Sequence, residues 1–378
     1  MNRFAIYVHV PWCRRRCPYC DFYFVVGRPE PRFFDAIVSE WEGRRHLYVN
    51  KPAESLYFGG GTPSLLAPEM FQKLAEFFVS DGGLDQGAEI TIEANPEDID
   101  EDFALRLART PVNRISLGIQ SFDDQVLKSL GRKHDSARAK KAIGFLQQAG
   151  FGNISIDLIL GVNHEDIGNI ERSLYYLIGL KIPHISTYLL TIEEGTKFSN
   201  LIRAGHMKDI DEDAQVEAYR MAQRILNSAG YVQYDISSFG QPHYFSQHNQ
   251  VYWAGGHYLG LGPKAHSMRL LPDGGAERAE NSVDVMTWLN GHITRTAELL
   301  SPKEALRESL AFGLRNMKSG IRPSELEGRH QAIIPEGFFN ALKGPKDRGW
   351  LDMQGQSIKI NSTGALFADS IMRDILLT

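Results

Sequence analysis

The sequence predicts an α/β fold in which β-α units surround a parallel sheet. Short β-branched runs alternate with helical stretches from residue 5 onward, and six such units can be counted. This alternation is typical of parallel strands joined by crossover helices. At 378 residues the chain exceeds what one hydrophobic core usually serves, so we expect a large domain and a smaller one. The alternation alone fits both a doubly wound open sheet and an incomplete barrel.

Six apolar runs are the candidate strands, and each is followed by a loop and an amphipathic segment. They are residues 5–10, 55–58, 89–94, 114–119, 154–160 and 185–190. Among the helices, 137–149 has the clearest period, because Ala139, Ala142, Ile143 and Leu146 fall on one face. A longer helix is expected over 211–229.

Unusual residues follow the carboxyl ends of these strands. The cysteines come after the first strand, a Gly-Gly-Gly-Thr-Pro turn at 59–63 after the second, Glu93 at the end of the third and Gln120 after the fourth, while Asp157 lies within the fifth. Singly, Glu93 and Asp157 are typical of surface ion pairs. Together they favour an incomplete barrel, because loops at that rim form the active site of α/β barrels.

All three cysteines lie in one short loop, Cys13-Arg14-Arg15-Arg16-Cys17-Pro18-Tyr19-Cys20. An odd count in one loop is no disulfide framework, whereas C-x-x-x-C-x-x-C spacing can bring three thiolates to one metal centre. A zinc site would need a fourth ligand from His9 or Asp21. An iron–sulfur cubane can instead leave one iron open for a second molecule. The spacing favours the cluster, and we expect the neighbouring arginines to lower the thiol pKa values.

Composition excludes several classes of protein. The formal net charge of -5 argues against a protein that coats nucleic acid, and no apolar run is long enough to span a bilayer. The opening segment 1–10 is too short for a signal peptide. Unpaired thiols indicate a reducing, cytoplasmic location.

The stretch 231–269 is dense in glycine, histidine and aromatic residues and has no clear helical or strand period. Within it, His248-Asn249-x-x-Tyr252-Trp253 places an imidazole beside two large flat rings. This arrangement fits a pocket for a planar cofactor, and it also fits ordinary aromatic packing under a long loop. Residues 271–279 look like a polar turn and a boundary.

The last part of the chain predicts a winged-helix-like α+β domain. It opens with Ser301-Pro302-Lys303-Glu304, which has the residues of a capped helix start. Three helices and a hairpin near 351–360 should follow. Its charges are nearly balanced, so we interpret it as a packing or partner surface rather than a DNA-binding module. The expected division is a barrel over 1–240, a linking segment over 241–300 and this domain over 301–378.

Four stretches taken together resemble the radical S-adenosylmethionine (SAM) proteins, in particular their oxygen-independent coproporphyrinogen oxidase-like branch. They are residues 7–13 (YVHVPWC), 18–22 (PYCDF), 57–64 (YFGGGTPS) and 115–122 (ISLGIQSF). The resemblance implies a partial (β/α)6 TIM-like barrel in which Cys13, Cys17 and Cys20 hold a [4Fe-4S] cluster. It also implies that SAM chelates the fourth iron and is cleaved by one electron to a 5'-deoxyadenosyl radical. The residues similar to the family's SAM contacts are Tyr7, Tyr19, Gly60, Gly61, Thr62, Glu93, Gln120, Arg132 and Asp157.

Two features divide that branch. Coproporphyrinogen oxidases carry a fourth cysteine where this sequence has Phe22, and the stretch at 248–253 resembles the H-N-x-x-Y-W heme motif of the branch's heme chaperones. The resemblance therefore implies heme binding, with His248 as axial ligand and Tyr252 and Trp253 shaping the pocket. The implied function is transfer of heme to apo-hemoproteins, with an electron donor, peripheral membrane association and a homodimer as further expectations. The alternative is an enzyme, an oxygen-independent coproporphyrinogen III dehydrogenase that decarboxylates two propionates.

Overall fold

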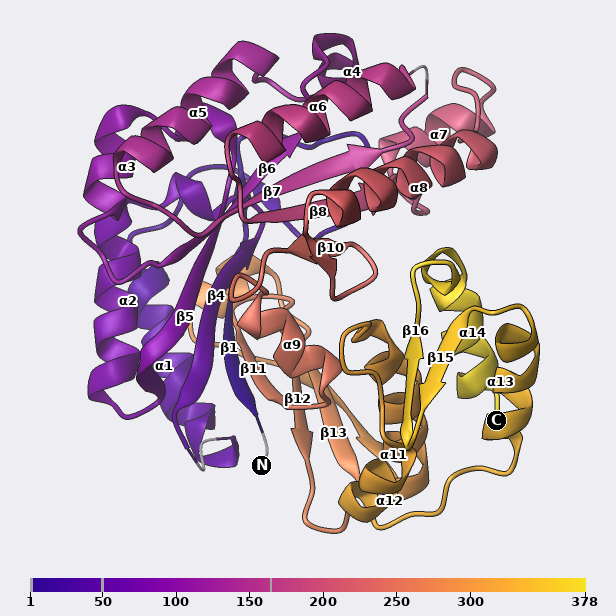
Figure 1. Cartoon of the computed structure of the whole chain (residues 1–378). Helices are drawn as coiled ribbons and strands as arrows, with labels where there is room; N and C mark the ends of the chain where they lie inside the picture. Colours follow the sequence, from indigo (N-terminus) through magenta and orange to yellow (C-terminus); the bar gives the residue numbers. More distant parts are fainter. Residues whose placement is uncertain (1–2, 49–50, 164) are drawn as a thin grey trace.

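The computed structural model describes residues 3–48, 51–163 and 165–378, and one 12-stranded sheet dominates it (Figure 1). All six predicted strands are present, and they lie side by side and parallel in chain order. They are β1 (Phe4–Val10), β4 (Ala53–Gly60), β5 (Leu84–Ala94), β6 (Arg114–Gln120), β7 (Ile154–Leu160) and β8 (His184–Leu189). The short pair β2 (Trp12–Cys13) and β3 (Val25–Val26) frames the cysteine loop.

The strand order distinguishes the two architectures that the sequence left open. A doubly wound sheet reverses its strand order at a switch point, whereas β1 to β8 follow one another without a reversal. Beyond these strands, β1 pairs with β11 (His257–Leu261) and β8 pairs with β10 (Ser238–Gly240). The barrel is therefore open, and the predicted partial (β/α)6 barrel is confirmed.

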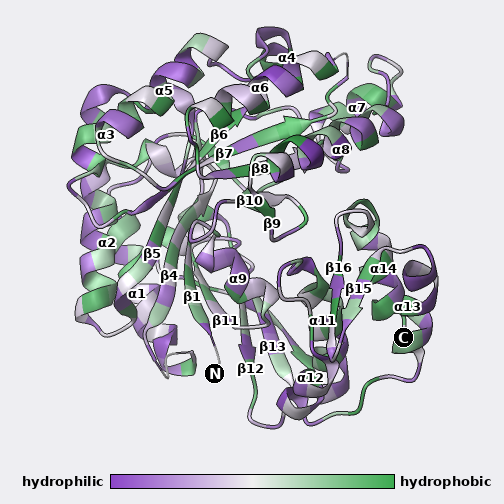
Figure 2. Ribbon diagram, in the orientation of Figure 1, coloured by the Kyte–Doolittle hydropathy of each residue, from purple (hydrophilic) through white to green (hydrophobic). Residues whose placement is uncertain are grey.

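Helices cover the outer face of this curved sheet (Figure 1). They are α1 (Phe33–Arg44), α2 (Pro68–Ser80), α3 (Glu101–Leu107), α4 (Asp124–Ser129), α5 (Ser136–Gln148), α6 (Ile167–Gly179), α7 (Lys197–Arg203) and α8 (Glu212–Ser228). Helix α5 buries Ala139, Ala142, Ile143 and Leu146, the face that its period predicted. Figure 2 shows hydrophobic residues gathered on the strands and polar residues on the outward sides of the helices. No helix among the described residues is long and apolar enough to cross a membrane.

The stretch 231–300 is more regular than the sequence predicted. It contains β9 (Val232–Gln233), β10, α9 (Gln247–Trp253), β11, β12 (His266–Leu270), β13 (Ala276–Asn281), α10 (Val285–Leu289) and β14 (Arg295–Leu300). Strands β12, β13 and β14 extend the main sheet as an antiparallel meander. Of the expected polar turn at 271–279, residues 271–275 connect β12 to β13 and the rest belong to β13, and the Leu271 N–H donates to the Gly275 carbonyl oxygen at 2.9 Å.

A buried polar network fastens this extension to α1. Glu40 accepts hydrogen bonds from the indole of Trp288 and the backbone N–H of Gly262, both at 2.8 Å. Arg44 pairs with Glu40 and donates to the Ser267 hydroxyl at 2.8 Å. Because both charges are buried and paired, removal of either partner would leave a costly unpaired charge.

The C-terminal domain has the predicted winged-helix-like content. It consists of α11 (Pro302–Phe312), α12 (Pro323–His330), α13 (Gly337–Asp347), the hairpin β15 (Leu351–Gln354) and β16 (Ser357–Ile360), and α14 (Ala368–Leu376). The capping box between Ser301 and Glu304 is present. The domain has its own hydrophobic core, which Tyr219 of α8 joins.

Candidate functional site

A cavity of about 390 Å³ lies at the carboxyl ends of the parallel strands, beneath the cysteine loop. Eleven of the twelve residues expected at the cluster and SAM sites line it, and they come from segments far apart in the sequence. They are Cys13, Cys17, Tyr19, Cys20, Gly60, Gly61, Thr62, Glu93, Gln120, Arg132 and Asp157. Tyr7 is the exception, because its ring borders a second cavity and its hydroxyl lies 3.2 Å from His9 Nδ1.

The three thiols are half-buried and interact with residues outside their own loop. The Thr62 hydroxyl donates to Cys13 Sγ at 3.3 Å, and an Arg132 nitrogen lies 3.9 Å from Cys17 Sγ. Burial raises the pKa of Cys13 to about 11, against a smaller opposing effect of Arg132. The loop arginines do not lower the Cys13 pKa as expected, since Arg14 is turned away and pairs with Asp98 at 2.7 Å.

No group of three His, Cys, Asp or Glu side chains within the described ranges is arranged to hold a single metal ion. An iron–sulfur cubane makes a different demand on the protein, because each thiolate binds a different iron. The three thiols face one cavity, which also holds space beside them for a second molecule.

Glu93 is the half-buried carboxylate nearest the glycine turn. Its Oε1 accepts from the Tyr57 hydroxyl at 2.9 Å and its Oε2 from the Gly60 N–H at 3.2 Å. Burial raises the pKa of Glu93 to about 7. The Gly61 N–H donates to the Val10 carbonyl oxygen, so the N–H groups of Gly60 and Gly61 both have acceptors within the protein. The Glu93 carboxylate makes this wall suited to a cation or a hydrogen-bond donor.

The glycine turn and Gln120 owe their positions to close packing. A Cβ on Gly61 would lie 2.7 Å from the Trp12 carbonyl oxygen, so a side chain there would push the cysteine loop away. Gln120 has a φ of 69°, at an irregularity in the pairing of β6 with β7. A Cβ on Gly118 would lie 2.9 Å from the Gln120 amide, so glycine makes room for that side chain.

Asp157 and Arg132 complete the opposite wall. The Ser116 hydroxyl donates to Asp157 Oδ2 at 2.8 Å, and burial raises the pKa of Asp157. Arg132 donates to the Gly118 carbonyl oxygen at 3.0 Å and also bonds Asn95. The cavity therefore combines two half-buried carboxylates with one fixed guanidinium.

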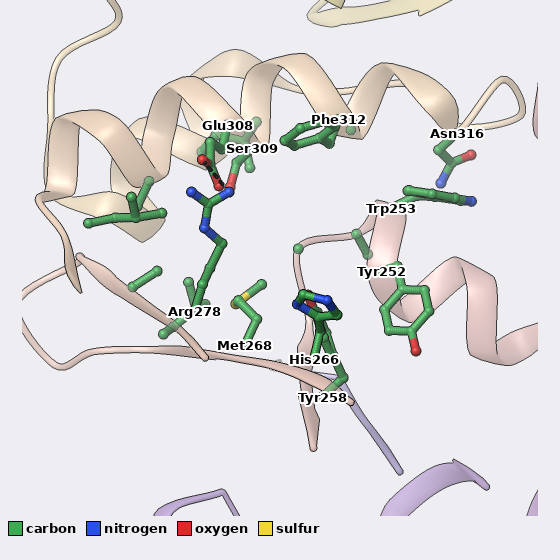
Figure 3. Close-up of a pocket in the computed structure, with 18 of the residues that line it drawn as sticks. Tyr252, Trp253, Tyr258, His266, Met268, Arg278, Glu308, Ser309, Phe312 and Asn316 are labelled. Atoms are coloured by element: carbon green, nitrogen blue, oxygen red, sulfur yellow. Dashed lines mark ion pairs between the residues drawn. The ribbon is translucent and has the colours of Figure 1, made fainter. Parts of the chain in front are cut away.

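A second cavity, of about 1,080 Å³, separates the strand extension from the C-terminal domain. Figure 3 shows His266, Met268 and Arg278 pointing from the sheet towards the helix that carries Glu308 and Phe312, α11. Tyr252 and Trp253 of α9 line it. The sequence did not single out Met268 or Arg278, because the stretch 231–269 has no clear strand period.

His248 lies behind Tyr252 rather than in this cavity. Its side chain is 1% exposed, and its ring stacks on Tyr57 with centroids 4.8 Å apart. Its Nδ1 lies 2.9 Å from the Ser55 hydroxyl and its Nε2 lies 2.7 Å from the Tyr252 hydroxyl. Burial lowers the pKa of His248 to about 3, so the ring is neutral.

Phe22 connects the two cavities. Its side chain is 73% exposed and lines both of them. A flat apolar side chain at that place forms a shared wall between the cysteine loop and the larger cavity.

Comparison with known proteins identifies the class first. A family model described as the radical SAM superfamily matches residues 7–174, the part that carries the cysteine loop and the rim residues up to Asp157. The solved structure of coproporphyrinogen III oxidase HemN from Escherichia coli, a radical SAM enzyme, shares the fold with a TM-score of 0.80. It is 20% identical and covers 99% of this chain and 90% of its own.

Curated relatives define the family more narrowly. The heme chaperone HemW of Escherichia coli is 35% identical over 97% of this chain and 97% of its own length. The bovine radical S-adenosyl methionine domain-containing protein 1, mitochondrial, is 32% identical over 99% of this chain and 88% of its own. The chain therefore belongs to the radical SAM family that includes HemW.

Proposed function

We propose that this protein is a heme chaperone that binds a [4Fe-4S] cluster, SAM and heme and transfers heme to apo-hemoproteins in the cytoplasm. The observation that supports this most is the pair of adjoining cavities that share Phe22. One has the donor set of a radical SAM site, and the other has the size and the aromatic walls suited to a porphyrin. The relatives named heme chaperone HemW support the same function.

In the smaller cavity, Cys13, Cys17 and Cys20 would hold the cluster. When bound, the cluster supplies one electron for cleavage of the SAM sulfonium. The half-buried carboxylates of Glu93 and Asp157 would accept hydrogen bonds from the ammonium and ribose groups of SAM. The fixed guanidinium of Arg132 suits the methionyl carboxylate. Tyr19 and Gln120 would pack around the rest of SAM, and Tyr7 would support the glycine turn from behind.

In the larger cavity, Tyr252 and Trp253 would pack against the porphyrin plane. The volume of about 1,080 Å³ is at the upper end of small-molecule sites, as a macrocycle requires. Its sheet wall carries both apolar and charged side chains, among them Met268, Leu270 and Arg278, which suits a flat apolar ring with two carboxylates. We propose that the chain divides into a barrel over 1–240, a linking segment over 241–300 and the C-terminal domain over 301–378. The larger cavity then lies where these parts meet.

Anaerobic titration tests the proposal. Protein reconstituted with iron and sulfide is titrated with heme, then mixed with an apo-hemoprotein, and transfer is followed by the change in the heme spectrum. Stoichiometric binding followed by transfer is expected. No heme binding would contradict the proposal, and sustained formation of protoporphyrinogen from coproporphyrinogen with SAM and reductant would replace it with the decarboxylase function.

A further inference from the structure

We propose that His266, and not His248, offers the ligand to the heme iron, and that His248 is a positioning residue for Tyr252. This inference rests on the proposed function, because it assigns the ligand within the proposed heme cavity. The shape of the cavity alone does not give the position of the iron, whereas an assigned ligand does.

His266 has the geometry of an available ligand. It lies on β12, is exposed, and lines the larger cavity (Figure 3). No hydrogen-bond partner within the described part of the chain holds its ring nitrogens. Met268 lies two residues along the same strand and lines the same cavity, while Ser267 between them is buried on the other face. A nitrogen and a thioether sulfur, both ligands that heme iron accepts, therefore stand about 7 Å apart along one strand.

A row of side chains across the sheet continues this face. Met268 pairs with Tyr258 of β11 on one side and with Arg278 of β13 on the other. Arg278 bonds Glu298 at 2.6 Å and Glu308 at 2.9 Å, so its guanidinium is held at the cavity wall. A carboxylate of the ligand can replace the exposed Glu298, because exposed ion pairs contribute little. An iron ligand at His266 and a guanidinium near it suit a flat ring whose propionates lie at one edge.

His248 lacks every one of these properties. It does not line the cavity, and both of its ring nitrogens lie within hydrogen-bonding distance of Ser55 or Tyr252. The helix that carries it is also fixed at its first turn, where the Glu89 carboxylate accepts from the N–H groups of Gln247 and His248 at 3.1 Å. For His248 to reach an iron, the ring would have to leave both partners and displace Tyr252. Its position instead holds the Tyr252 ring against the cavity.

Heme titration of four proteins tests the assignment: the wild type, His266→Ala, His248→Asn and the control His206→Ala. His206 is exposed and lies outside both cavities. Asn at 248 keeps a polar group near Nδ1 and so protects the fold. Each protein is titrated with heme in the absence of SAM, and absorption and electron paramagnetic resonance report the iron ligand.

His266→Ala is expected to lose the histidine-ligated spectrum and to raise the Kd for heme at least about tenfold, since even outer-shell partners of a metal ligand contribute about 10–100-fold. Added imidazole should restore the spectrum of this variant. His248→Asn and His206→Ala should retain it. An unchanged spectrum in His266→Ala, or its loss in His248→Asn alone, would overturn the assignment. Failure of the wild type to bind heme would instead overturn the proposed function.

Discussion

The Nε2 atom of His248 and the hydroxyl of Tyr252 lie 2.7 Å apart, and only Tyr252 reaches the larger cavity. The histidine of the H-N-x-x-Y-W stretch therefore acts on the cavity through the tyrosine. On its other side the same ring meets Ser55 and Tyr57, both from β4 of the barrel. The motif thus fastens α9 to the sheet, whatever ligand the cavity holds.

Tyr252→Phe should lower the free energy of unfolding by about 1–3 kcal/mol, because it leaves a buried imidazole nitrogen without a partner. Urea unfolding of the ligand-free protein measures this. Tyr258→Phe is the matched control, since that ring lines the same cavity and makes no hydrogen bond that the described residues show. It should change stability by less than about 0.5 kcal/mol. An equal loss of unfolding free energy in both variants would contradict a stabilising role for the 2.7 Å contact between His248 and Tyr252.

The contribution of Glu93 to the stability of the ligand-free protein should fall as the pH rises from 4.5 to 7. Burial raises the pKa of Glu93 from 4.5 in the unfolded chain to about 7, so the folded state keeps a proton that the unfolded chain has released. This contribution falls with rising pH through the window, by up to about 1.4 kcal/mol per pH unit. The raised pKa of Asp157 acts in the same direction. Buried histidines such as His248, whose pKa is lowered to about 3, act in the opposite direction. Urea unfolding of the wild type and of Glu93→Gln at pH 5, 6 and 7 therefore isolates the contribution of Glu93.

Glu93→Gln should lose this falling contribution, since the amide does not titrate, so its stability should rise more, or fall less, with pH than that of the wild type. Glu69→Gln is the control, because Glu69 is exposed and its hydrogen bond to Arg106 lowers its pKa. It therefore titrates below the window. The same pH dependence in Glu93→Gln as in the wild type, or an equal change in Glu69→Gln, would contradict this role of Glu93.

The strands and their rim residues could be predicted because local pattern determines both. A run of β-branched residues predicts a strand at the place where it occurs, and the carboxyl ends of parallel strands meet at one edge of the sheet. Strands β12 to β14 were not predicted from the sequence, and the reason is physical. Strand β12 turns His266 and Met268 to a cavity between domains, so its residues do not alternate simply between apolar and polar.

Residues that are close in sequence were also expected to contact one another, and this expectation holds for some of them and fails for others. Arg14 lies beside Cys13 in the chain but pairs with Asp98, whereas Arg132, 115 residues from Cys17, approaches its sulfur. The role of His248 depends on Ser55, which is 193 residues away. A local sequence pattern cannot predict contacts between residues so far apart in the chain. Before the structure, only the resemblance to radical SAM proteins pointed to Arg132.

Cys17→Ser should abolish assembly of the cluster. Anaerobic reconstitution of the wild type should give about four irons per chain, and the variant should give close to none, because a hydroxyl is a poor ligand for iron–sulfur clusters. Iron and sulfide analysis after desalting measures this. Arg16→Ser is the matched control, since Arg16 lies in the same loop, is exposed and lines neither cavity. Stoichiometric zinc without iron in the wild type would favour the zinc site instead.

Phe22→Ala should uncouple the binding of SAM and heme. Because Phe22 lines both cavities, a ligand in either one restricts its ring, and each ligand should change the other's affinity by the same factor. The Kd for heme is measured with and without saturating SAM in reconstituted protein. The ratio of the two values should approach one in Phe22→Ala and stay at the wild-type value in Val26→Ala.

Val26 is a fitting control, since it is a nearby apolar side chain that is 63% exposed and lines neither cavity. Neither change should alter stability by more than about 0.5 kcal/mol, because both side chains are exposed. A wild-type ratio retained in Phe22→Ala would mean that the shared wall does not transmit binding between the two cavities.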